Sequence, residues 1–94
     1  MREIFQLAAA DRHGLLEESC LTGEFMMQAF AGEKLNVAAL GNLVPQLHLH
    51  HVIRRKDDPA WPGPVWGHSA AVPYPQQLLD ERMRILRDGL SIAT

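Results

Sequence analysis

The chain has 94 residues, of which 47% are hydrophobic and 21% are charged, with a formal net charge of -2 at pH 7. This length and composition are typical of one small globular domain covering residues 1–94. Charges of both signs are mixed along the chain, which excludes an extended basic surface for nucleic acid or for an anionic membrane. The single cysteine, Cys20, excludes an internal disulfide and favours a reducing, cytoplasmic location.

The amino-terminal sequence MREIFQLAAADRHG has charges on both sides of a very short apolar stretch. It predicts neither a signal peptide nor a membrane span. Residues 2–7 can form a short strand, with Phe5 and Leu7 on one face.

A long helix is predicted over about residues 8–31, where helix-forming residues continue without a proline. Gly32 supplies a left-handed stop after it. Four side chains of this helix are expected in the core: Cys20, Met26, Met27 and Phe30.

Two strands are expected next, over about residues 35–40 and 46–54. Between them, Gly41 and Asn42 form a pair that tolerates positive φ and turns the backbone. Pro45 delays regular pairing to Gln46, because proline cannot donate to a ladder. Alternation then separates two faces, one with Gln46, His48, His50 and Val52, the other with Leu47, Leu49, His51 and Ile53.

A long ordered loop is predicted over about residues 56–74, because RRKDDPAWPGPVWGHSAAVPYP holds five of the six prolines and both tryptophans. Trp61 and Trp66 are expected to pack onto the domain, and stacking on a nucleobase is the alternative.

A last helix is predicted over about residues 75–88, with Pro75 in its first turn and Gly89 at its end. The fold class is α+β. Two strands leave both sheet edges open, so further strands are expected from residues 2–7, a partner chain or an upstream segment.

Three of the five histidines cluster in NLVPQLHLHHVIRR, residues 42–55. Side chains two apart on one strand face lie about 7 Å apart, so His48 and His50 can address a single phosphate, with Gln46 beside them. A neutral imidazole can attack phosphorus, while a neighbouring polar side chain holds the phosphoryl oxygens. His51 points to the opposite face and is expected to be structural.

Other interpretations of these residues are solvated histidines or a zinc site. Only His48 and His50 converge, and no spacing enforces a third ligand from Asp57, Asp58 or His68. No metal and no cofactor are therefore expected. Two arginines, Arg54 and Arg55, can reach a phosphate, but a solvated pair with local ion partners is the favoured interpretation.

The stretch NLVPQLHLHHVIRR resembles the signature strand of the histidine triad (HIT) proteins, and DPAWPGPVWG resembles a bacterial branch of that family. With LNVAALGN, the resemblance covers about Leu35 to Gly67 in detail, and the helix order extends it over most of the chain. It implies a HIT-like fold, an antiparallel sheet with a long helix before the catalytic hairpin and a helix at the carboxyl terminus. It also implies a homodimer.

The resemblance further implies a nucleotide hydrolase or transferase that forms a nucleotidyl-histidine intermediate. The implied substrates are dinucleoside polyphosphates, nucleoside phosphoramidates or adenylates, with a purine base. By position, His48 is the nucleophile and His50 binds the α-phosphate and assists the leaving group. The residues that line the substrate by the same resemblance are Gln46, Asn42, Asn36 and Gly41.

Two departures from the family pattern stand out. Gln46 occupies the place of the first triad histidine, and a glutamine forms hydrogen bonds but carries no proton charge. The family's strands before the long helix are also missing, so the chain is either a truncated product or is completed by another chain. A non-catalytic nucleotide-binding or interaction module of the same family is therefore the alternative function.

Overall fold

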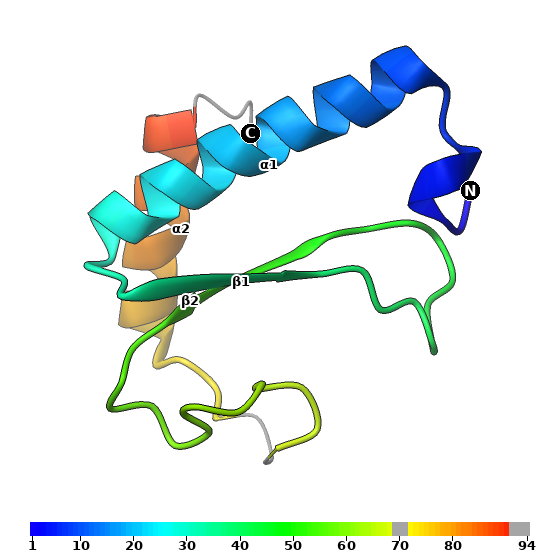
Figure 1. The fold of residues 1–94 in the computed structure, drawn as a ribbon. Coiled ribbons are helices and arrows are strands. Elements are labelled where there is room, and N and C mark those ends of the chain that lie inside the picture. Colours follow the sequence, from blue (N-terminus) through cyan, green and yellow to red (C-terminus); the bar gives the residue numbers. More distant parts are fainter. Residues whose placement is uncertain (69–71, 91–94) are drawn as a thin grey trace.

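A computed structural model describes residues 1–68 and 72–90 of the chain (Figure 1). Its elements in chain order are a short 3-10 helix η1 (Ile4–Gln6), α1 (Ala9–Ala29), β1 (Lys34–Ala38), β2 (His50–Arg54) and α2 (Gln76–Leu90). The strands pair antiparallel, with Lys34 opposite Arg54 and Ala38 opposite His50. The fold class is α+β, as the sequence predicts.

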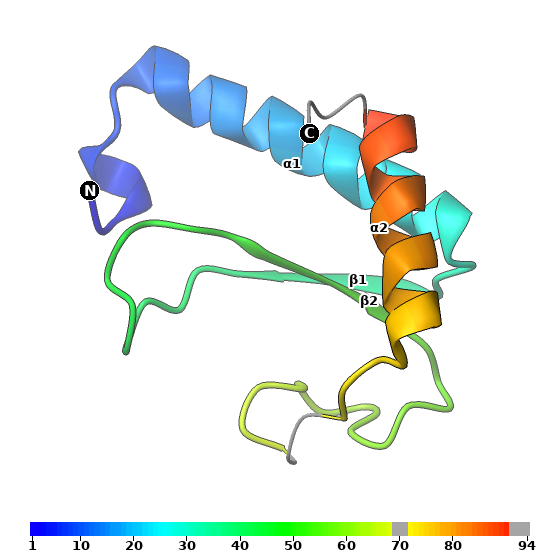
Figure 2. The same cartoon turned by 180° about the vertical axis from the view of Figure 1, so that it is seen from behind.

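The sheet of β1 and β2 lies between α1 on one face and the loop after β2 on the other (Figures 1 and 2). Both strands direct alternate side chains to α1, among them Leu35, which touches Gly23, and His51, which hydrogen-bonds Ser19. The intervening residues, including Asn36 and His50, face the loop. The sheet therefore divides the histidines between a helix face and a loop face.

The end of α1 has the expected left-handed turn, but the left-handed residue is not a glycine. The residue with positive φ is Ala31, at 51°, and the N–H of Gly32 donates to the carbonyl of Met27 at 2.9 Å. A Cβ on Gly32 would meet the side chains of Met27 and Ile53. The expected left-handed stop is thus one residue earlier, and Gly32 serves close approach.

The carboxyl-terminal helix α2 crosses the second half of α1 (Figure 2). It begins after Pro75, whose carbonyl accepts the N–H of Leu79 at 3.0 Å. The sequence predicts that Gly89 ends this helix, but the helix includes Gly89 and continues to Leu90. A Cβ there would overlap the ring of Phe25, so the glycine lets the two helices approach.

Residues 2–7 do not form the strand that their alternation allows. They turn into η1, because the side-chain oxygen of Gln6 accepts the backbone N–H groups of Arg2 and Glu3 at 2.9 and 3.0 Å. Such local hydrogen bonds compete with strand pairing. The carbonyl of Met1 still accepts the N–H of Leu47 at 2.8 Å, which ties this end to the histidine segment.

The second strand is shorter than expected. It begins at His50, where Gln46 was expected, because its partner β1 ends at Ala38, directly opposite His50. Residues 46–49 have no strand opposite them and form no ladder. His48 therefore lies just before the sheet and not within it.

No hydrophobic side chain is fully buried among residues 1–68 and 72–90. The expected core residues Met26, Met27 and Phe30 are half-buried between α1, β2 and α2, and Cys20 is exposed, against expectation. Cys20 lies on the solvent side of a helix that has only one face on the sheet. No described helix is both long enough and apolar enough to cross a membrane.

Candidate active site

His48 and His50 lie together at the start of β2, although only His50 belongs to the strand. Their ring centroids are 4.9 Å apart, with 62° between the ring planes. His48 is exposed and His50 is half-buried. The two imidazoles can therefore reach one small group from the same side.

One hydrogen bond determines which ring nitrogen of His48 carries the proton in the neutral imidazole. Its Nδ1 lies 2.6 Å from the backbone carbonyl oxygen of Gln46. A carbonyl oxygen only accepts, so Nδ1–H is the donor and the neutral ring carries its proton there. The other ring nitrogen, Nε2, then keeps a free lone pair. The arrangement leaves an exposed imidazole with a defined tautomer and a lone pair that can act as a nucleophile.

The backbone turns sharply beside these rings. Gly41 has a φ of 76°, as expected of a residue in such a turn. It lines a small hollow together with Gln46 and His48. Asn42 is exposed and does not line this hollow.

A larger groove opens on the other side of His48. It has a volume of about 370 Å³ and runs between residues 46–49 and the first half of α1. Asp11 and Glu18 bring carboxylates to it, and Leu7 and Leu15 bring apolar surface. The groove is large enough for part of a nucleotide, and His48 is one of the residues that line it.

The one fully buried polar side chain in the described part of the structure is Arg54, which is 1% exposed. Its Nε and Nη2 donate to the two carboxylate oxygens of Asp58 at 2.8 and 3.0 Å. Its Nη1 donates to Oδ1 of Asn36 at 2.7 Å. This contradicts the expectation of a solvated arginine. The signal in the sequence was the four-residue spacing to Asp58, which also fits an exposed pair.

The same contacts act on the ionisation of both partners. Hydrogen bonds from Arg54 hold the pKa of Asp58 at about 2, below its ordinary value of 3.8, and Asp58 raises the pKa of Arg54. Both groups therefore stay charged throughout the physiological range.

Asp58→Asn is expected to lower the Tm at pH 7 and to flatten its dependence on acid pH. The pKa of Asp58 is lower in the folded state than its ordinary value of 3.8. The contribution of Asp58 to the free energy of unfolding is therefore present above pH 3.8 and is lost as the pH falls toward about 2. Circular dichroism melts between about pH 5 and pH 2 test this, with the exposed Asp57→Asn as the control. Equal acid sensitivity of the parent and Asp58→Asn would contradict it.

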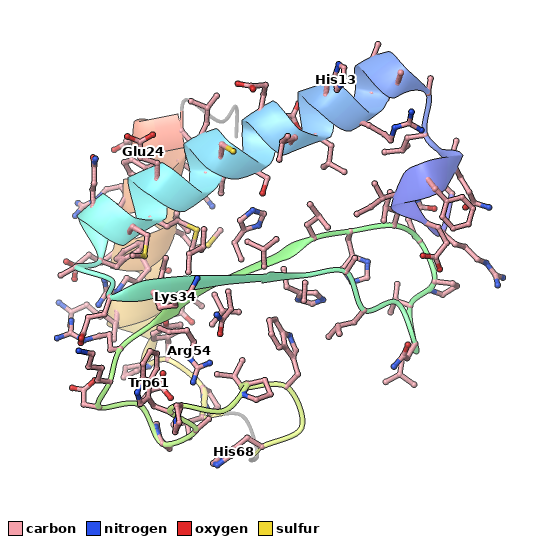
Figure 3. All side chains as sticks on the ribbon, viewed as in Figure 1. His13, Glu24, Lys34, Arg54, Trp61 and His68 are labelled. Atoms are coloured by element: carbon pink, nitrogen blue, oxygen red, sulfur yellow. The ribbon has the colours of Figure 1, made fainter. Side chains whose placement is uncertain are left out.

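Both tryptophans of the loop pack onto the domain, as the sequence predicts. The ring of Trp61 lies 5.5 Å from the guanidinium carbon of Arg54. Trp66 makes an edge contact with His50, at 6.0 Å between centroids. Figure 3 shows Arg54 and Trp61 on the loop side of the sheet.

The third clustered histidine, His51, faces α1. Its Nε2 is 2.7 Å from the hydroxyl oxygen of Ser19 in a half-buried contact. This bond joins the helix to the strand that carries His50. Among the residues that the structure describes, no three His, Cys, Asp or Glu side chains are grouped as a metal site requires.

Solved structures give the family. A histidine triad protein from Marinobacter aquaeolei VT8 matches 97% of this chain with a TM-score of 0.91 and 49% sequence identity. The chain belongs to the histidine triad family. Histidine triad proteins from Sinorhizobium meliloti 1021 and Bradyrhizobium japonicum match 95% of it, with identities of 38% and 36% and TM-scores of 0.89 and 0.90.

This histidine triad chain spans 66% of the length of each of these three proteins. No protein-family model matches the sequence, and no curated protein matches it. Gln46 stands at the position that the resemblance assigns to the first triad histidine. In the structure Gln46 meets His48 through its backbone carbonyl, a contact that any side chain at position 46 would allow.

Proposed function

We propose that this chain hydrolyses or transfers nucleotidyl groups through a covalent intermediate on His48. The observation that carries the proposal is the hydrogen bond from Nδ1 of His48 to the carbonyl of Gln46. This bond leaves Nε2 of the neutral ring unprotonated. The ring of His48 is exposed, and its centroid lies 4.9 Å from that of a second imidazole, His50. An activated nucleophile beside a group that can bind phosphoryl oxygens is what nucleotidyl transfer requires.

In the first step the Nε2 lone pair of His48 attacks the α-phosphorus of the substrate. An N–P bond forms, and the bond from phosphorus to the leaving group breaks, so that its electron pair departs with that group. In the second step water, or another acceptor, attacks the same phosphorus and breaks the N–P bond. The released nucleotide takes the oxygen of water, and its proton passes to solvent.

The neighbouring groups have distinct roles in this scheme. His50 binds the α-phosphate with a ring N–H and assists the leaving group. We assign to the backbone N–H groups of Gly41 and Asn42, and to the Gln46 side chain, the role of donating hydrogen bonds to phosphoryl oxygens. Asn36 donates from the loop face of β1. Since Gln46 carries no proton charge, it binds the substrate without acting as an acid or base.

The substrates we propose are dinucleoside polyphosphates, nucleoside phosphoramidates or adenylates, with a purine base. The groove beside His48 is the proposed site of the nucleoside. We also propose a homodimer, because β2 pairs only with β1 in the described sheet and its other edge has no strand beside it. We propose a cytoplasmic location from the single cysteine.

Trapping the intermediate tests the mechanism. The parent chain is mixed with a nucleoside phosphoramidate, quenched in alkali because phosphorus–nitrogen bonds to histidine are acid-labile, digested and analysed by mass spectrometry. The expected result is one nucleotidyl group on the peptide that contains His48. Label on another residue would overturn the role of His48.

A second measurement separates catalysis from binding alone. Adenosine monophosphate is expected to raise the Tm of the parent chain, because it binds the folded state only. A raised Tm with no label and no turnover would favour a non-catalytic nucleotide-binding module. An unchanged Tm and no label would exclude both functions for the isolated chain.

A further inference from the structure

The guanidinium of Arg54 binds the loop after β2 at several points. Besides Asp58 and Asn36, Arg54 binds the carbonyl of Gly63 through Nη2 at 2.7 Å. Asp58 accepts the backbone N–H of Trp61 at 2.8 Å. A buried arginine with these partners has its charge compensated and its geometry fixed in several directions. The loop therefore has a defined position relative to β2.

This position brings an aromatic ring to His50. Trp66 contacts the imidazole edge-on, with 75° between the ring planes. His48 makes a further edge contact with the same imidazole. Edge-to-face contacts between aromatic rings are favourable and directional. Rotation of the His50 ring would break at least one of them, so the loop restricts the orientation of His50.

The same guanidinium also orients Asn36. A guanidinium has only donors, so the atom of Asn36 that faces Arg54 is the oxygen, and the amide nitrogen is left to donate elsewhere. Asn36 lies opposite Val52, on the face that carries His50, one diagonal step along the ladder. Arg54 thus fixes one donor, as well as the loop, on the face of His50.

We propose that Arg54 is a positioning residue of the phosphoryl site. Through Asp58 and the loop it places Trp66 against His50, and through Oδ1 it turns the amide N–H of Asn36 toward the same face. This inference rests on the proposed function of His48 and His50. A ring held in one orientation aims its N–H at the phosphoryl oxygens without reorganising as charge develops.

Arg54→Lys is the first test. Lysine keeps the charge but cannot bind Asp58 at two points while also reaching Asn36 and Gly63. The expected result is a fall in kcat of about 10- to 100-fold, because small displacements of a reacting group have effects of this size, while KM stays close to that of the parent. Arg55→Lys is the matched control, since Arg55 is exposed and its side chain forms an ion pair with Asp57 alone among the described residues, at 3.6 Å.

Trp66 provides a second pair of variants that does not depend on Arg54→Lys folding. Trp66→Leu removes the ring from His50 and is expected to reproduce the fall in kcat. Trp66→Phe keeps a ring at this place and is expected to restore most of the activity. A folded Trp66→Leu protein with the kcat of the parent would overturn the proposal.

Nuclear magnetic resonance of the imidazole groups supplies a readout that does not need turnover. The indole of Trp66 imposes a ring-current shift on His50, so Trp66→Leu and Arg54→Lys are expected to move the His50 signals and not those of His13. If the parent chain shows no turnover but the two variants shift the His50 signals, the proposed function is refuted and the positioning by Arg54 is supported. If the parent chain turns over substrate but the variants leave the His50 signals unchanged, the positioning alone is refuted.

Discussion

His48→Asn is expected to lower the kcat for nucleotide turnover by about 10³-fold or more, since it removes the atom proposed to attack phosphorus in the first step. Asparagine is a stringent choice, because its amide N–H can still donate to the Gln46 carbonyl while nothing replaces Nε2. His48 is exposed, so the Tm should change little. Steady-state assays on a nucleoside phosphoramidate and thermal melts of both proteins measure the two effects.

The matched control is His13→Asn. His13 is exposed on α1 and points away from the sheet (Figure 3), so this variant should keep the activity of the parent. A His48→Asn protein that hydrolyses the substrate as fast as the parent would show that the nucleophile is elsewhere. A similar loss in both variants would point to a general effect of histidine replacement and not to His48.

Gly89→Ala is expected to destabilise the fold by about 1–3 kcal/mol, the usual effect of inserting a methyl group into a filled contact. The new Cβ would overlap the ring of Phe25 where α2 crosses α1. For a chain of this length such a loss corresponds to a fall in Tm of roughly 5 to 20 °C. Thermal and urea unfolding measure it.

The control for this prediction has the opposite sign. Gly14 lies within α1 and a Cβ there would meet nothing within 4 Å. Gly14→Ala should therefore stabilise the chain by about 0.5–1 kcal/mol through helix propensity alone. If both variants raised the Tm, helix propensity and not contact with Phe25 would decide the effect at Gly89.

Features that depend on local pattern could be predicted from the sequence. The apolar spacings and the absence of proline predict both helices, and the turn at Gly41 follows from the backbone freedom of glycine. The convergence of His48 and His50 was expected from strand alternation. It occurs although His48 precedes the strand, because an extended backbone alternates its side chains whether or not it is paired.

Features that depend on a distant partner could not be predicted. Strand β2 begins at His50 because its partner β1 ends at Ala38. The residues around Gln46 do not indicate where β1 ends. The role of Gly89 depends on Phe25, which is far away in the chain. Arg54 shows the same limit, because its charge suggests solvent and only the fold supplies Asp58, Asn36 and a carbonyl to it at once.

The lack of a fully buried hydrophobic side chain in residues 1–68 and 72–90 has a calorimetric consequence. The heat-capacity change of unfolding grows with the apolar surface that unfolding exposes, and a typical domain of about 100 residues has a value near 1.2–1.5 kcal/mol/K. The isolated chain, whose described apolar side chains are all at least partly exposed to solvent, is expected to have a smaller heat-capacity change. Its free energy of unfolding is therefore expected to curve only weakly with temperature. A partner strand or a nucleotide that covers this apolar surface would increase both the free energy of unfolding and its curvature with temperature.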